Sequence, residues 1–213
     1  MINKDFIRKW SSGYQVQYDE SHYDPYIVKA RNGDKEALRK VTEWKNPRKD
    51  GSPMDFSRHQ KKESSFQYFI NRLSKYLGEK GENELRHDFK NRAPIWSIFW
   101  HHVLFQTPIF DRYTHMAYYW DETGIILNVS VAKIKTPNHW QIYNQYRAWF
   151  EKTLKRLKEE DNSISERQLD RALFCWGEAE VKKQNQKNKS EICNNALQRI
   201  LNSGENHAAI KNR

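Results

Sequence analysis

The sequence predicts an all-α fold. Through most of its 213 residues, apolar and aromatic side chains recur every three or four positions, the spacing that places them on one face of a helix. Proline and glycine divide this pattern into helix-sized segments, and no internal repeat is present. The β-branched stretch 125–134 is the only strand-like segment, and because one strand makes no sheet, we expect it to be simply extended.

The composition is basic and aromatic. Hydrophobic residues make up only 37% of the chain, so the core must rely on eight tryptophans, eleven tyrosines and ten phenylalanines. The formal net charge is +10 and the isoelectric point is about 9.5. A polyanion is therefore the expected partner, with a solubilising surface charge as the alternative. Nucleic acid is favoured over a membrane surface, because no basic amphipathic anchor is evident.

The termini and cysteines indicate a cytoplasmic protein. The first residues, MINKDFIRKW, lack the apolar core of a signal peptide, and no run approaches the length of a membrane span. Two cysteines, Cys175 and Cys193, are too few for a disulfide scaffold or a four-cysteine metal site. We expect a monomer with no membrane partner, no metal and no cofactor.

In the N-terminal part, residues 1–33 are polar and aromatic without a clear period, apart from a short helix expected near 4–10. Asp34 is suited to start the next helix, whose apolar face runs to Trp44. Pro47 ends this helix, because proline lacks the backbone N–H that a helix interior requires.

A loop rich in Pro, Gly, Asp and Arg is predicted over 46–58. Ser64 or Ser65 is then expected to cap a helix with a stripe of phenylalanine, isoleucine and leucine. Gly78 and Gly81 close this helix, because glycine favours helix ends.

Two further helices flank a proline turn. A short charged helix is expected at 82–90, and the next spans about 95–105 with a proline in its first turn. The Thr-Pro pair at 107–108 breaks it, and a new helix covers about 111–120. A turn is expected at 121–124.

The C-terminal third is also helical by its spacing. A long aromatic helix starts near Pro137, and another starts at Ser163 or Ser165. Gly177 is expected to end that helix, and the basic, Asn/Gln-rich stretch 182–189 reads as a linker.

A last helix is predicted at 192–201, with a frayed tail after Gly204. We therefore divide the chain into an N-terminal extension packing on the core (1–33), a helical domain (34–177), and a basic C-terminal helix and tail (178–213).

Asp111 is the residue on which the functional interpretation depends. It follows the stiff, largely apolar segment 107–110 and stands where a helix begins. An aspartate there caps free N–H groups, and the helix dipole favours its ionised form. The same position suits a catalytic carboxylate, so capping and catalysis both remain open. Basic or imidazole side chains lie nearby in the sequence: Arg112, His115, His101 and His102.

Two segments carry a resemblance to a known family. The phrase PIFDRYTHMAYYW resembles the segment around the catalytic aspartate of helix-hairpin-helix DNA glycosylases, especially a divergent group similar to 8-oxoguanine DNA glycosylase. The segment QLDRALFCWG, residues 168–177, resembles a later helix of that family, and Trp44-Lys45-Asn46 is a weaker hint. The resemblance covers about residues 35–177.

The resemblance implies an all-helical globule with a DNA-binding cleft between two helical subdomains and Asp111 as the catalytic carboxylate at its floor. The partner would be double-stranded DNA carrying a modified or damaged base. The candidate DNA contacts are Lys45, Lys90, Arg92, Arg112 and Arg171. The candidate base-pocket residues are Trp44, His101, Phe110 and Trp176.

Two departures from the family narrow this expectation. Its hairpin holds a phosphate on a glycine-rich turn, whereas the corresponding stretch 90–94 has no glycine. No lysine stands where bifunctional members carry their nucleophile, so a monofunctional enzyme that leaves an abasic site is expected. The divergent hairpin suggests a specialised substrate, such as a hypermodified base in phage DNA, and hence a role in antiphage defence.

The chemistry itself requires little. Breaking a base–sugar bond builds positive charge on the deoxyribose, as in glycoside hydrolysis, and an ionised carboxylate can stabilise that charge without a metal. The base must first leave the stack, which calls for an aromatic pocket and a basic surface.

Each candidate also has a structural interpretation. Trp44 and Trp176 suit a core, Asp170 suits a local ion pair, and His101 and His102 point about 100° apart on a helix, which disfavours a shared metal. A non-catalytic nucleic-acid-binding module is the main rival function, because it shares the charge and the aromatic residues. A nuclease is a third, and no carboxylate cluster points to it.

Overall fold

Helices are the regular elements of this protein. The computed structural model describes residues 2–46, 48 and 52–210, with side chains described through residue 188 and at 190. These residues form eleven α-helices and one 3₁₀ turn, and none of them lies in a strand. The predicted all-α class is therefore confirmed, and the stretch 125–134 is irregular.

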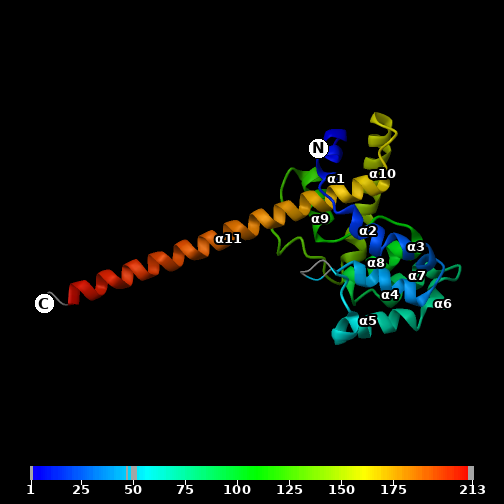
Figure 1. The fold of residues 1–213 in the computed structure, drawn as a ribbon, viewed down its shortest axis with the longest axis horizontal. Coiled ribbons are helices and arrows are strands. Elements are labelled where there is room, and N and C mark those ends of the chain that lie inside the picture. Colours follow the sequence, from blue (N-terminus) through cyan, green and yellow to red (C-terminus); the bar gives the residue numbers. More distant parts are fainter. Residues whose placement is uncertain (1, 47, 49–51, 211–213) are drawn as a thin grey trace.

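The elements in chain order are α1 (Lys4–Ser11), α2 (Val16–His22), α3 (Asp24–Arg31), α4 (Lys35–Trp44), η1 (Phe56–Arg58), α5 (Gln60–Ile70), α6 (Leu73–Tyr76), α7 (Gly81–Asp88), α8 (Pro94–Phe105), α9 (Arg112–Thr123), α10 (His139–Glu160) and α11 (Glu166–Ile210). Figure 1 shows α2–α8 gathered into one body, with α1, α9, α10 and the first part of α11 beside it.

The core is centred on α8. Every residue from Ser97 to Val103 is buried, because this helix is apolar nearly all round and contacts α3, α7 and α10. Trp100 is fully buried and stacks on Phe69 with ring centroids 4.4 Å apart. Its indole N–H donates to Thr42 Oγ1 at 3.2 Å. The aromatic residues thus fill the core, as the composition predicts.

Two helices in the N-terminal part were not expected. Residues 1–33 show no clear period, yet α2 and α3 form there and bury Asp19, Tyr23 and Ile27. The reason is that their buried face mixes a carboxylate and aromatic rings with aliphatic side chains, so hydrophobic periodicity does not reveal it.

The helix expected from Ser64 or Ser65 to Leu77 is instead two helices. The first, α5, begins earlier, and a break separates it from the short α6, leaving Leu77 46% exposed. Gly81 starts α7 and does not close the preceding helix. A Cβ at Gly81 would lie 1.8 Å from the Tyr76 carbonyl oxygen, so the close chain approach requires glycine.

The expected helices at 34–44, 82–90 and 95–105 correspond to α4, α7 and α8. Asp34 caps α4 by accepting from the Ala37 amide at 2.8 Å. Pro47 lies outside the described residues. The turn expected at 121–124 is wrong in part, because α9 continues to Thr123 and ends at Gly124 in a left-handed conformation.

The expectation that Gly177 ends a helix is wrong. Helix α11 runs from Glu166 to Ile210 through the stretch 182–189 that was expected to be a linker, and also past Gly204. A Cβ at Gly177 would lie 2.3 Å from the Tyr113 carbonyl oxygen, so this glycine lets α11 approach α9. Beyond its contacts with α1 and α9, α11 extends away from the other helices (Figure 1). The division of the chain at 33 and 177 remains a prediction.

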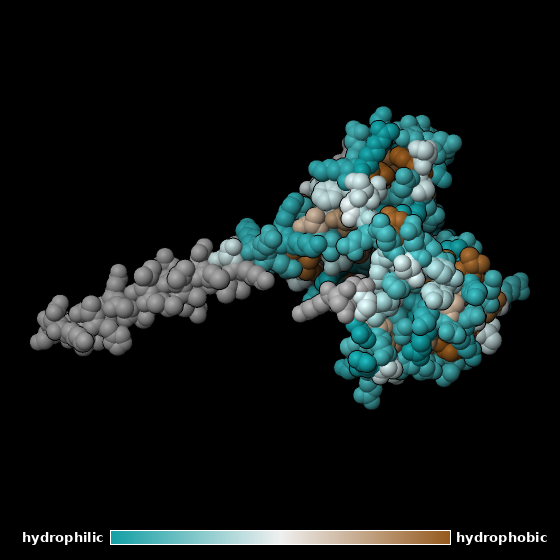
Figure 2. Space-filling model, viewed as in Figure 1, coloured by the Kyte–Doolittle hydropathy of each residue, from teal (hydrophilic) through white to brown (hydrophobic). Residues whose placement is uncertain are grey.

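No helix among the described residues is both long and apolar enough to cross a membrane. The face shown in Figure 2 is mostly hydrophilic, with its hydrophobic residues in small, separate groups.

Gln106 ends α8 in a left-handed conformation with φ of 53°, which costs a non-glycine residue about 1–2 kcal/mol. We expect Gln106→Gly to raise the free energy of unfolding by about 0.5–1 kcal/mol, because glycine adopts this conformation without steric cost. Urea denaturation measures the change. Gln106→Ala is the matched control and should bring no gain, so equal stabilisation by both would contradict this explanation.

Candidate functional site

Asp111 is the N-cap of α9. Its Oδ1 accepts hydrogen bonds from the backbone amides of Tyr113 at 2.8 Å and Thr114 at 3.1 Å. The Thr114 hydroxyl oxygen accepts in return from the Asp111 amide at 2.9 Å, which completes a capping box. The capping interpretation is therefore confirmed, and one carboxylate oxygen remains for another role.

That second oxygen faces Lys45, which directly follows α4. Lys45 Nζ lies 2.8 Å from Asp111 Oδ2, and the two side chains are only 10% and 11% exposed. Burial by itself raises the pKa of Asp111, but the charge and hydrogen bond of Lys45 and the two backbone amides outweigh it. The net effect lowers the pKa below its ordinary value. The site thus holds a buried, ionised acid.

A cavity of about 370 Å³ opens beside this ion pair. Four aromatic side chains line it: Tyr14, Tyr18, Trp44 and Phe174. The other polar or charged side chains that line it are Gln15, Lys45, Asp111, Thr114, Asp170, Glu178 and Lys182. The size lies in the range of small-molecule sites, and an apolar wall with a few converging polar groups is their usual composition.

Four separate chain segments build this cavity: the turn between α1 and α2 with α2 itself, the end of α4, the start of α9, and one face of α11. The α11 residues Asp170, Phe174, Glu178 and Lys182 are each four positions apart, so they lie along a single helix face. Glu178 and Lys182 form an ion pair at 2.9 Å on this face.

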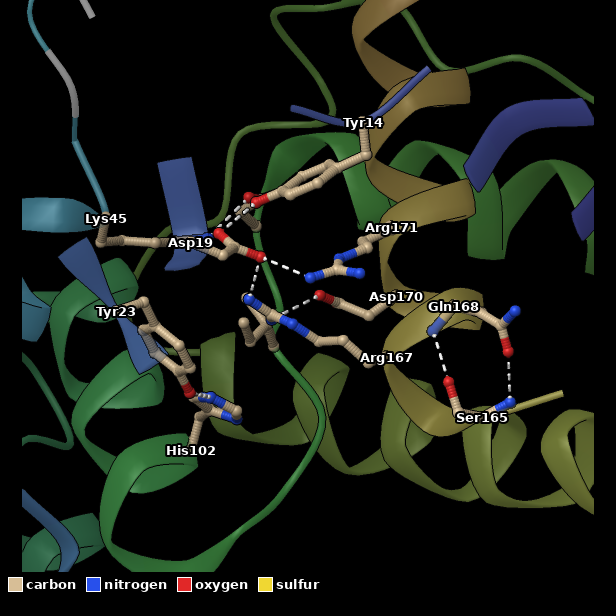
Figure 3. A network of polar contacts seen from close by, with 12 residues as sticks. Tyr14, Asp19, Tyr23, Lys45, His102, Ser165, Arg167, Gln168, Asp170 and Arg171 are labelled. Carbon is tan, nitrogen blue, oxygen red and sulfur yellow. Dashed lines mark hydrogen bonds and ion pairs between the residues drawn. The ribbon is translucent and has the colours of Figure 1, made fainter. Parts of the chain in front are cut away.

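A buried network around Asp19 joins three of these segments, the α1–α2 region, the end of α4 and α11 (Figure 3). Asp19 is 0% exposed. Its Oδ1 accepts from the Tyr14 hydroxyl at 3.0 Å and from the Trp44 indole at 3.1 Å. Its Oδ2 accepts from Arg167 at 2.5 Å and Arg171 at 3.0 Å. One carboxylate on α2 therefore positions two cavity walls and two arginines of α11.

A second cavity, of about 420 Å³, shares Ile109 and Asp170 with the first. Three arginines line it, Arg31, Arg167 and Arg171, together with the acids Asp24 and Glu166. His102 also faces it and hydrogen-bonds to Tyr23 at 2.7 Å. Burial lowers the pKa of His102 to about 3, so this imidazole is neutral at physiological pH.

The structure brings together only some of the predicted base-pocket residues. Trp44 lines the cavity around Asp111, as expected. His101 lies elsewhere, bonded to Thr107 and Glu82, and burial lowers its pKa to about 4. Phe110 stacks on Tyr146, and Trp176 stacks on Trp120. His101, Phe110 and Trp176 do not line the cavity around Asp111, and each makes ring contacts with other side chains of the core.

The predicted DNA contacts also separate into two groups. The side chains of Lys45 and Arg171 are held internally by Asp111 and Asp19. Arg112 is half-buried and donates to the Tyr113 hydroxyl at 3.0 Å. Lys90 and Arg92 are exposed on the turn between α7 and α8, where Arg92 lies over the Tyr68 ring. DNA contact by these residues stays a prediction.

Sequence reasoning missed Tyr14, Tyr18, Asp19, Phe174 and Glu178. The four-residue spacing from Asp170 to Lys182 is a signal that could have identified the α11 face. No comparable signal marks the N-terminal tyrosines, because their role depends on where α2 packs.

Among the described residues, no three His, Cys, Asp or Glu side chains lie where they could hold a metal ion together. Comparison with known proteins found no matching family model, no matching curated protein and no matching solved structure.

Proposed function

We propose that this protein is a monofunctional DNA glycosylase that hydrolyses the N-glycosidic bond of a modified base and leaves an abasic site. The observation that carries the proposal is the buried, ionised Asp111 beside an aromatic-walled cavity of about 370 Å³. We propose a hypermodified base in phage DNA as the substrate. The protein would then act in antiphage defence.

The chemistry follows from the charge of Asp111. As the base leaves, positive charge develops on the deoxyribose, and a preorganised carboxylate in a site of low dielectric stabilises that charge. The cap hydrogen bonds to Oδ1 fix the carboxylate in place, so no reorganisation is needed during the reaction. Tyr14, Trp44 and Phe174 offer ring faces for a base that has left the stack.

Two further observations support the proposal. The net charge of +10 favours a polyanionic partner. Lys45 forms an ion pair with Asp111 and helps to keep this carboxylate ionised beside the cavity.

The test is base release from a panel of duplex DNAs, each carrying one modified base, with abasic sites detected by alkaline strand cleavage. We expect Asp111→Asn to reduce release by about 10²–10³-fold, because asparagine keeps the cap but loses the charge. Asp34→Asn makes the same change at another helix cap and should leave release unchanged.

The rival function is a non-catalytic nucleic-acid-binding module, which is favoured by the capping box that already accounts for Asp111. If the protein binds DNA but releases no base from any substrate, and Asp111→Asn binds DNA equally well, the module is established and the glycosylase is rejected.

A further inference from the structure

Asp170 is a second carboxyl group of the cavity around Asp111. It projects from α11 and lines both cavities, which meet at this residue and Ile109. Its Oδ2 lies 3.4 Å from an Arg167 nitrogen, at the long end for a hydrogen bond (Figure 3). Its Oδ1 is buried and has no hydrogen-bond partner among the described residues. Buried polar atoms normally have a partner. Because Asp170 lines both cavities, rotation of its carboxyl group toward either one would present Oδ1 to a bound ligand.

The groups around Asp170 carry both signs of charge. Arg167 and Arg171 accompany it on α11, Lys45 comes from the end of α4, and Asp111 and Asp19 come from the start of α9 and from α2. Burial raises the pKa of Asp170 to about 6, and the two aspartates add to this while Arg167 and Lys45 oppose it.

Other charged or titratable side chains line the two cavities: Asp24, His102, Glu166, Glu178 and Lys182. Burial raises the pKa of Glu166 above its ordinary value, whereas His102 stays neutral. Three tyrosines and one cysteine near Asp170 keep one protonation state over the pH range in question. Burial raises the pKa of Tyr14, Tyr23 and Tyr146 well above the ordinary tyrosine value. It raises the pKa of Cys175 to about 11. Between pH 5 and 8 these four side chains therefore stay neutral.

We infer that Asp170 is the acid of this site, and that its carboxyl group donates a hydrogen bond from Oδ1 to an acceptor nitrogen of a purine-like base bound in the cavity. The two carboxyl groups have different environments and therefore different roles. Asp111 is held ionised by Lys45 and by the cap hydrogen bonds, whereas Asp170 is enclosed and has one oxygen without a hydrogen-bond partner. Such a separation of two acids by their environments is how one site provides both an acid and an anion.

The catalytic part of this inference rests on the proposed function. The C1′–N bond breaks and its electron pair goes to the base, while the Asp170 proton passes to a ring nitrogen of that base. Water then bonds to C1′ and loses a proton, which returns to the Asp170 carboxylate. The sum is DNA plus water giving abasic DNA plus the neutral base, with Asp111 unchanged.

Binding of two neutral probes tests the hydrogen bond without any need for turnover. The probe 9-methylpurine has ring acceptors and no N–H, whereas 1-methylindole has a similar two-ring shape without those acceptors. Equilibrium dialysis of each probe at pH 5 and pH 8 gives the affinities. The donor is present below the pKa of Asp170, so we expect wild-type protein to bind 9-methylpurine about tenfold more tightly at pH 5. The affinity for 1-methylindole should not depend on pH.

Three variants separate this role from a structural one. Asp170→Asn keeps an N–H donor at every pH, so it should bind 9-methylpurine equally at pH 5 and 8, and at pH 8 more tightly than wild type does. Asp170→Ala should bind it weakly at both. Asp111→Asn should keep the pH dependence but move it to lower pH, because the Asp111 charge is one of the groups that raise the pKa of Asp170.

If the wild-type protein binds 9-methylpurine equally well at pH 5 and pH 8, the inference is wrong. It is also wrong if the wild-type protein binds 9-methylpurine at neither pH. Base release from DNA without pH-dependent purine binding overturns only the role of Asp170. A third outcome is purine binding that weakens as the pH rises and is lost in Asp170→Ala, with no base release from any DNA. That outcome rejects the glycosylase function and supports the hydrogen bond from Asp170.

Discussion

Replacing Asp19 by alanine is expected to lower the free energy of unfolding by about 3–5 kcal/mol, because it leaves buried positive charge without its partner. Asp19 is fully buried and accepts hydrogen bonds from Arg167 and Arg171 of α11. It also accepts from Tyr14 and Trp44, so four donors lose their acceptor together. Urea denaturation followed by tryptophan fluorescence measures the loss.

Two comparisons identify the cause of that loss. Asp5→Ala removes an exposed aspartate from the first turn of α1 and should cost below about 0.5–1 kcal/mol. Adding Arg167→Met and Arg171→Met to Asp19→Ala should recover part of the stability, because the unpaired charges are then gone. If the triple variant is no more stable than Asp19→Ala, the loss does not come from unpaired arginines.

Gly177→Ala is expected to destabilise the protein by about 3 kcal/mol, although alanine is the better helix former by about 1 kcal/mol. The added Cβ would lie 2.3 Å from the Tyr113 carbonyl oxygen and 2.7 Å from two further backbone atoms of that residue. Backbone cannot rotate out of the way as a side chain can, so α9 must shift at its start. Asp111 is two residues from Tyr113, and the base release that we propose should therefore fall together with stability.

Gly13→Ala provides the control for this substitution. A Cβ at Gly13 would meet only the Trp10 carbonyl oxygen, at an ordinary 3.6 Å, and we expect a change within about 0.5 kcal/mol. Unfolding midpoints in urea, compared at equal m-value, measure both variants. A stabilising Gly177→Ala would show that α11 and α9 are not in close backbone contact.

Some elements follow from the sequence because their causes are local. The helix starts at Asp34 and Asp111 are capping interactions that span three residues, and both form as predicted. The strongly apolar stretch 95–105 is a helix buried over 97–103 for the same kind of reason, since apolar side chains lie on nearly all of its faces. Gly177 misleads because a glycine at a helix end and a glycine at a helix crossing are identical in the sequence.

The candidate site was predicted less completely than the fold. Trp44 and Asp111 line one cavity together with Lys45, which was predicted as a DNA contact and is paired with Asp111. His101, Phe110 and Trp176 do not line that cavity and make ring contacts elsewhere. The rest of the cavity around Asp111 is lined by Tyr14, Tyr18 and the α11 face. These residues line it only because the N-terminal helices and α11 pack against each other.

By itself, then, the sequence determines that this protein is helical, that it is basic with an aromatic core, and that Asp111 begins a helix. These properties arise from composition and from interactions within one or two turns. Only the tertiary structure decides that Lys45 holds Asp111 ionised across 66 positions and that Asp19 binds Arg167 across 148. Such contacts depend on how every helix fills the space around α8, and no local pattern encodes that arrangement.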